Sequence, residues 1–218
     1  MNTSAATAPT RTSVLVELVI VTTLAALFVL FFSGRPGYID VALGLVAVGL
    51  IGASTRRSRE IWRGVRRPSA DPRAAARWMV IFTTLVASMF LAIGVLTGYS
   101  ANGWQGAWDR VGNWHLLVAC ALYSPWALLQ QFVFQFYLFG RLRCVLAYWP
   151  AVLITAVAYS AVHFPRVPVM AGTVFAGVIW AATYHRYGKL LPLAASHAVL
   201  GSTLHYWVFG RDLAVLWS

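Results

Sequence analysis

The stretch WHLLVACALYSPWALLQQFVFQFYLF, residues 114–139, is an apolar run long enough to cross a lipid bilayer. It contains Gln130, Gln131 and Gln135. An amide in hydrocarbon is costly unless it is hydrogen-bonded, so amides at this depth face a bundle interior or a wet cavity. At about 100° per residue, Gln131 and Gln135 share one helix face and Gln130 lies beside them. The stretch therefore predicts a transmembrane helix and marks the place of a functional site.

The composition predicts the same kind of protein. The chain is 60% hydrophobic and 11% charged, whereas soluble domains carry about 25% charged residues. Six long apolar runs reach or approach the ~20 residues that a membrane span needs, and a seventh is shorter. We therefore predict an all-α, polytopic transmembrane helical bundle of about seven spans. The expected spans are 13–32, 38–54, 78–98, 114–139, 148–164, 168–184 and 190–209.

The positions of the basic residues predict the orientation. Sixteen of the seventeen are Arg, and eight of them lie between Arg56 and Arg77. An N-terminus inside and a C-terminus outside would place thirteen basic residues on the cytosolic side and four on the other. This asymmetry favours an N-in, C-out protein. The expected location is the bacterial inner membrane, as a multi-pass protein.

The net charge of +11 follows from this topology, so we expect no nucleic-acid partner. The alternative is recognition of anionic lipids by TRRSREIWRGVRR, residues 55–67. There the side chains of Ile61, Trp62 and Val65 would dip into the headgroups. The segment is therefore a candidate lipid-binding surface.

No low-complexity linker divides the chain, and the basic loop 55–77 is its longest break. We predict an N-terminal part, 1–112, with three spans and this loop, followed by a core of four spans, 113–218. A loop, SANGWQGAWDRVGN, is expected to form an aromatic belt at the outer surface through Trp104, Trp108 and Trp114, the last of which follows it directly.

Two smaller features concern packing and charge within the membrane. Gly172 and Ala176 form a small-xxx-small step suited to close contact between helices. Among the six acidic residues, only Glu17 is expected to lie within the membrane and not at the very end of a span, about one turn from the cytosolic end of the first span. Its side chain could snorkel to the surface or pair with a loop arginine.

Two histidines belong with the glutamines as candidate site residues. His163, in AYSAVHFPRVP, and His197, in LAASHAVLGS, have small neighbours that leave room around the ring. A lone membrane histidine more often bonds another helix than it catalyses, but two histidines and a glutamine cluster together favour a site. At 1.5 Å per residue, Gln131, His163 and His197 lie about 13, 20 and 10 Å from the cytosolic helix ends. Within the error of such boundaries, they can meet at one level.

At these residues the sequence resembles the CAAX protease and bacteriocin-processing (CPBP, or Abi) family of intramembrane endopeptidases. The family motifs are EExxxR, FxxxH and then HxxxN or HxxxD. QQFVFQ, 130–135, stands in place of EExxxR; YSAVH, 159–163, matches FxxxH with tyrosine; HAVLG, 197–201, keeps the histidine but ends in glycine. The resemblance covers about residues 114–205. It implies a helical bundle with a cavity open to the cytosol, where a glutamate is the general base and the histidines and the asparagine position water.

The departures from the motifs concern the chemistry itself. A general base must accept a proton near neutral pH, and the amide of Gln131 does not. The arginine position is Gln135, so the acids and their basic partner are both replaced, which avoids an arginine buried alone. We expect the glutamines to satisfy one another as a neutral amide network. The resemblance places the site at Gln130, Gln131, Gln135, His163 and His197.

Three functions then compete. The first is a modified endopeptidase in which His163 or His197 is the base, or in which both bind a metal; two histidines without a carboxylate make a thin ligand set. The second is a pseudo-protease that binds a membrane-anchored or lipidated peptide or protein without cutting it. The third is a small transporter or channel, for which the sequence indicates neither an intramembrane charge pair nor a pair of broken helices. No cofactor is expected, and whether the histidines bind a metal stays open.

Overall fold

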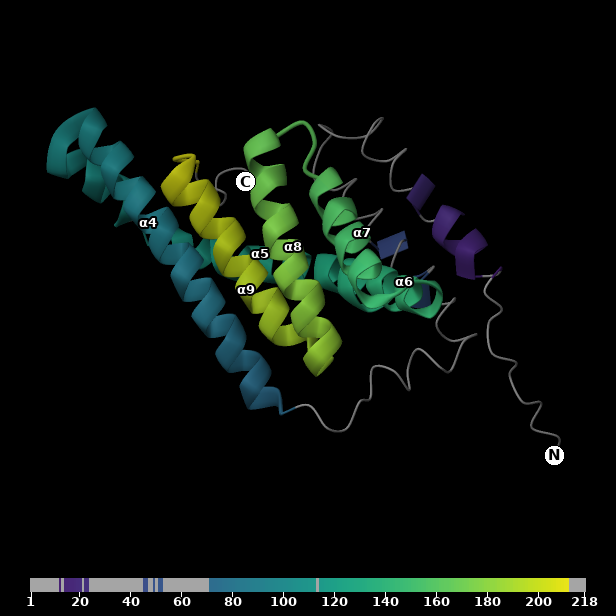
Figure 1. Cartoon of the computed structure of the whole chain (residues 1–218). Coiled ribbons are helices and arrows are strands. Elements are labelled where there is room, and N and C mark those ends of the chain that lie inside the picture. The colour runs from purple at the N-terminus through teal and green to yellow at the C-terminus, as the bar shows by residue number, and fades with distance from the viewer. Residues whose placement is uncertain are drawn as a thin grey trace. The chain divides into compact units, whose positions relative to one another are not determined.

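The structure of the protein is a computed structural model that describes residues 12, 14–20, 22–23, 45–46, 49, 51–52, 71–112 and 114–211 (Figure 1). From residue 71 onward the described chain forms helices joined by short connections, so the predicted all-α fold is confirmed for this part. The α-helices are α4 (Pro72–Val111), α5 (His115–Gln131), α6 (Gly140–Val145), α7 (Tyr148–Ala161), α8 (Val167–Tyr187) and α9 (Leu190–Thr203). Two π-helical segments, η1 (Phe132–Phe139) and η2 (Leu204–Val208), extend α5 and α9.

Three helices in the described part are long and apolar enough to cross a membrane: Pro72–Val111, His115–Val145 and Val167–Tyr187. The protein is therefore an integral, multi-pass membrane protein. Seven spans and the N-in, C-out orientation stay predictions. Most of the expected spans 13–32 and 38–54, and all of the lipid-binding segment 55–67, lie outside the described residues.

The chain divides into two compact units that alternate along the sequence. The first unit contains Met1–Ala70 and Gln131–Gly188, and the second contains Asp71–Gln130 and Lys189–Ser218. The helix that carries the glutamines passes from the second unit into the first between Gln130 and Gln131. The predicted division into 1–112 and 113–218 stays a prediction.

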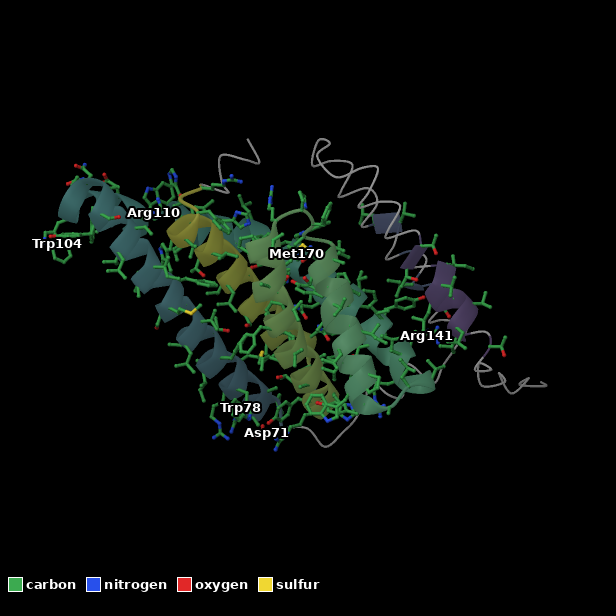
Figure 2. All side chains as sticks on the ribbon, turned by 45° about the horizontal axis from the view of Figure 1, so that its top comes forward. Asp71, Trp78, Trp104, Arg110, Arg141 and Met170 are labelled. Carbon is green, nitrogen blue, oxygen red and sulfur yellow. The ribbon has the colours of Figure 1, made fainter. Side chains whose placement is uncertain are left out.

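In the second unit, α4 packs along α9 and η2, and Figure 1 shows α4 and α9 side by side. Asp71 caps the start of α4, where its Oδ1 accepts a hydrogen bond of 2.9 Å from the Arg73 amide. Trp104 and Arg110 lie at the opposite end of α4 from Asp71 (Figure 2). This end of the helix is where the sequence had predicted a loop.

The loop prediction for SANGWQGAWDRVGN is wrong, because helix continues to Val111 around a sharp turn at Asn102 and Gly103. Gly103 has a φ of 58°, which glycine adopts without strain. After the turn, Gly98 and Gly106 come so close that a Cβ on either would collide with the backbone of the other. The glycines thus convert a polar connection into a helical hairpin. Trp104 and Trp108 remain largely exposed on it, at 76% and 68%.

In the first unit, α7 packs against α8 (Figure 1). The predicted small-xxx-small step is only partly right: Ala176 is buried, but a Cβ on Gly172 would meet nothing within 4 Å. The close approach occurs at Gly177, where a Cβ would lie 3.0 Å from the Cα and 3.2 Å from the Cβ of Ala156. The closest contact of α8 with α7 is therefore made at Gly177 and not at Gly172.

Gly177→Leu is expected to destabilise the protein by about 1–3 kcal/mol, because the new side chain overpacks the α7–α8 contact. Gly172→Leu is the matched control and is expected to change stability little, since position 172 faces open space. Unfolding of the purified protein in mixed micelles measures both. Equal losses for the two variants would contradict the packing at Gly177.

Candidate functional site

The glutamines lie where an α-helix changes into a π-helix. α5 ends at Gln131, and η1 begins at Phe132 without a break in the chain's helical course. Gln135 lies within η1. π-helical turns are rare, and they occur frequently at functional sites. The glutamines of the predicted site therefore lie at the start of a π-helical stretch and within it.

Gln131 and Gln135 are completely buried, at 0% exposure each, whereas Gln130 is half-buried. None of the four side-chain nitrogen and oxygen atoms of Gln131 and Gln135 has a hydrogen-bond partner among the described residues. The predicted self-satisfying amide network is therefore wrong for these two residues.

His163 is connected to the glutamine helix through one tyrosine. It lies half-buried in the turn after α7, and its Nδ1 is 3.0 Å from the carbonyl oxygen of Tyr159. The Tyr159 ring is fully buried and meets Phe134 of η1 edge-on, with ring centres 4.9 Å apart. It also meets Trp180 of α8 at 5.4 Å. Packing around Tyr159 thus fixes the position of His163 relative to η1.

His197 has a different tyrosine partner. It is 4% exposed on α9, and its Nε2 lies 3.1 Å from the hydroxyl of Tyr123 on α5. The two rings meet edge-on, with centres 5.4 Å apart. The Nε2 of His197 is therefore already engaged by a side chain of the protein.

Gly201 leaves room for this tyrosine. A Cβ at position 201 would lie 2.6 Å from Cε1 of Tyr123. In the motif, this position carries an asparagine or aspartate. Here the Tyr123 ring occupies the space that such a side chain would need. The observed position of Tyr123 therefore requires a glycine at position 201 in place of the motif residue.

The five predicted site residues are distributed over both units. Gln131, Gln135 and His163 belong to the first unit, and Gln130 and His197 belong to the second. Within the first unit, η1 and the turn after α7 are joined through Tyr159. A site that includes all five residues stays a prediction.

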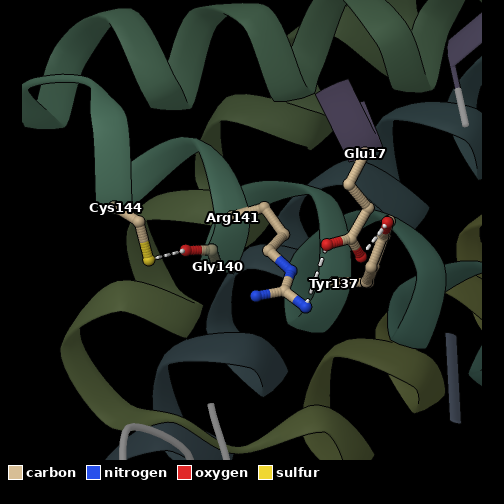
Figure 3. A network of polar contacts seen from close by, with 5 residues as sticks. All are labelled: Glu17, Tyr137, Gly140, Arg141 and Cys144. Atoms are coloured by element: carbon tan, nitrogen blue, oxygen red, sulfur yellow. Dashed lines mark hydrogen bonds and ion pairs between the residues drawn. The ribbon is translucent and has the colours of Figure 1, made fainter. Parts of the chain in front are cut away.

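Figure 3 shows an ion pair in the first unit that involves the intramembrane acid. Glu17 Oε2 lies 3.2 Å from Nη2 of Arg141, and the hydroxyl of Tyr137 donates a hydrogen bond of 2.6 Å to Glu17 Oε1. The Arg141 side chain is only 1% exposed. Of the two alternatives for Glu17, snorkelling or pairing with a loop arginine, the structure shows pairing with an arginine, but Arg141 lies in the short helix α6 and not in a loop.

The carboxylate of Glu17 does not stand in for the missing motif glutamate. Tyr137 follows Gln135 by two positions, and such residues lie on nearly opposite sides of a helix. Glu17 is held by Tyr137, on the side away from Gln135. Arg141 is one of the thirteen basic residues that the predicted topology places on the cytosolic side, so its burial was not expected. The signal in the sequence was Glu17, a lone intramembrane acid that requires a partner.

A family model described as type II CAAX prenyl endopeptidase Rce1-like matches residues 61–203. The chain belongs to this family. The resemblance of the motifs to CAAX proteases is thereby confirmed. The match to the Rce1-like family begins well before the motifs and includes α4. No curated protein and no solved structure matches the chain.

The described part of this Rce1-like chain contains no group of three or more His, Cys, Asp or Glu side chains that could hold a metal ion. His163 is instead bonded to a backbone carbonyl, and His197 to Tyr123. Of the site residues, Tyr123 and Tyr159 were missed by sequence reasoning. Nothing in ALYSPW marks Tyr123 as a partner of α9, whereas Tyr159 occupies the aromatic position of the FxxxH motif.

Proposed function

We propose that the protein is a non-catalytic member of the Rce1-like family, which binds a membrane-anchored or lipidated peptide or protein and does not cut it. The observation that carries the proposal is Gln131. It occupies the position of the motif glutamate, is completely buried, and bears an amide that cannot act as a general base. Binding of a ligand does not require a general base, so the loss of the motif glutamate is compatible with a binding role.

Two further features support loss of catalysis. Glu17 is committed to Arg141 and Tyr137 on the other side of the helix, so it is not a displaced base. At position 201, the Tyr123 ring takes the place of the side chain that positions water in the family. The base and the water-positioning group are thus both replaced by groups that cannot perform their steps.

The proposal predicts that the purified protein does not cleave prenylated peptides. We expect no product above background when a farnesylated peptide ending in Cys-aliphatic-aliphatic-Ser is incubated with the protein in nanodiscs and analysed by mass spectrometry. A family member that retains the EExxxR motif is the positive control. Cleavage by the wild-type chain at a rate comparable with the control would refute the proposal.

A second candidate is an endopeptidase that uses histidine as the base, and the geometry of His163 favours it. If Nδ1 donates to the Tyr159 carbonyl, Nε2 keeps a lone pair and can accept a proton. His197 is less suited, because its Nε2 is engaged by Tyr123. In the same assay, this candidate requires cleavage that His163→Ala abolishes and His197→Ala only reduces.

A further inference from the structure

We propose that Gln131 and Gln135 bind a backbone amide of the ligand, so that this site selects a peptide rather than a lipid chain. The inference rests on the proposed function, because it names the chemical group that the non-cutting site recognises. Two buried glutamines would each contribute a carbonyl acceptor and an NH₂ donor.

The observation behind the inference is that these amides lack partners. Both side chains are 0% exposed, and all four of their polar atoms are without a hydrogen bond among the described residues. Buried polar groups in proteins are nearly always hydrogen-bonded, and those that are not require an explanation. A ligand that supplies the missing bonds is such an explanation, and the location of both residues at the π-helical site of the family motif agrees with it.

The chemistry of the two side chains selects the ligand group. A peptide unit has one N–H donor and one C=O acceptor, and a glutamine side chain can bond to both. A prenyl or acyl chain offers neither group. A carboxylate or phosphate offers acceptors alone, so it would leave the glutamine carbonyls unsatisfied.

The energetics give the inference a distinctive signature. An unpartnered buried polar group costs about 1–3 kcal/mol, and an apolar group of the same shape removes that cost. Methionine is close to glutamine in shape and has no strong donor or acceptor. Gln131→Met and Gln135→Met should therefore stabilise the protein without ligand and weaken ligand binding. A purely structural role for the glutamines would not produce opposite changes in these two quantities.

The experiment measures both quantities on the full chain in nanodiscs. The probe is a fluorescent S-farnesylated Cys-Val-Ile-Ser peptide, with ester analogues in which one amide N–H at a time is replaced by oxygen. We expect each Met variant to bind the probe about tenfold more weakly and to unfold at a higher temperature. We expect one ester analogue to lose about tenfold in affinity for the wild type and much less for the Met variants.

The matched control is Gln105→Met, since Gln105 is exposed on α4 and hydrogen-bonded to Asp109. We expect it to leave probe affinity unchanged. The inference is refuted if the wild type does not bind the probe, if the Met variants bind it equally well, or if weaker binding comes with a lower unfolding temperature. Cleavage of the probe by the wild type would instead refute the proposed function. If the wild type binds the probe without cleaving it and the Met variants bind it equally well, this inference alone is refuted.

Discussion

Glu17→Ala is expected to destabilise the protein by about 3–5 kcal/mol, because it removes the carboxylate from a buried ion pair and leaves its charged partner behind. Arg141 is 1% exposed, and Glu17 Oε2 lies 3.2 Å from its Nη2. The same change removes the acceptor of the Tyr137 hydroxyl. The measurement is the free energy of unfolding in mixed micelles, with helicity followed by circular dichroism.

Further variants separate the contribution of the Glu17–Arg141 ion pair to stability from the contributions of the individual side chains. Arg141→Met is expected to cost less than Glu17→Ala, since the carboxylate that it leaves behind is 25% exposed and retains its bond from Tyr137. The double change Glu17→Met with Arg141→Met is expected to recover most of the stability, because a buried ion pair and an apolar replacement are often similar in free energy. Tyr137→Phe should cost about 1 kcal/mol. If Glu17→Ala unfolds like the wild type, the pair makes no net contribution and the assignment is wrong.

The sequence was sufficient for features that depend on long apolar runs. The runs at 78–98, 114–139 and 168–184 each correspond to a described helix that can cross a membrane. The location of the glutamines on such a helix followed from the same runs, whereas His163 follows the shorter helix α7 and His197 lies on the shorter helix α9. These predictions succeed because the hydrophobic requirement of a bilayer acts on every residue of a span.

The features that the sequence did not reveal depend on details of the backbone and on contacts between particular residues. The hairpin at the end of α4 arises because Gly98 and Gly106 allow two backbones to touch, and a loop of similar composition would look the same in sequence. The π-helical backbone of η1, which contains Gln135, is also not marked by the pattern of apolar residues. Likewise, the partnership of Tyr123 with His197 joins residues separated by 74 positions. Local patterns carry no information about such pairs.

Gly201→Asn, which restores the residue type of the family motif, is expected to destabilise the protein by about 2–4 kcal/mol. The new Cβ would lie 2.6 Å from Cε1 of Tyr123, so the ring must move. That movement overpacks the contact between α5 and α9 and breaks the hydrogen bond between Tyr123 and His197. Gly172→Asn is the matched control, because a Cβ at position 172 would meet nothing within 4 Å.

A double change tests whether the ring is the cause. Tyr123→Ala makes room, so Tyr123→Ala with Gly201→Asn should be more stable than the sum of the single effects by about 1–3 kcal/mol. Tyr123→Phe keeps the ring and removes only the hydroxyl, so it should leave the cost of Gly201→Asn nearly unchanged. Labelling with diethyl pyrocarbonate, located by mass spectrometry, provides an independent measure of the engagement of His197 Nε2. Labelling of His197 should increase in Tyr123→Phe, and an unchanged rate would show that Tyr123 does not hold this nitrogen.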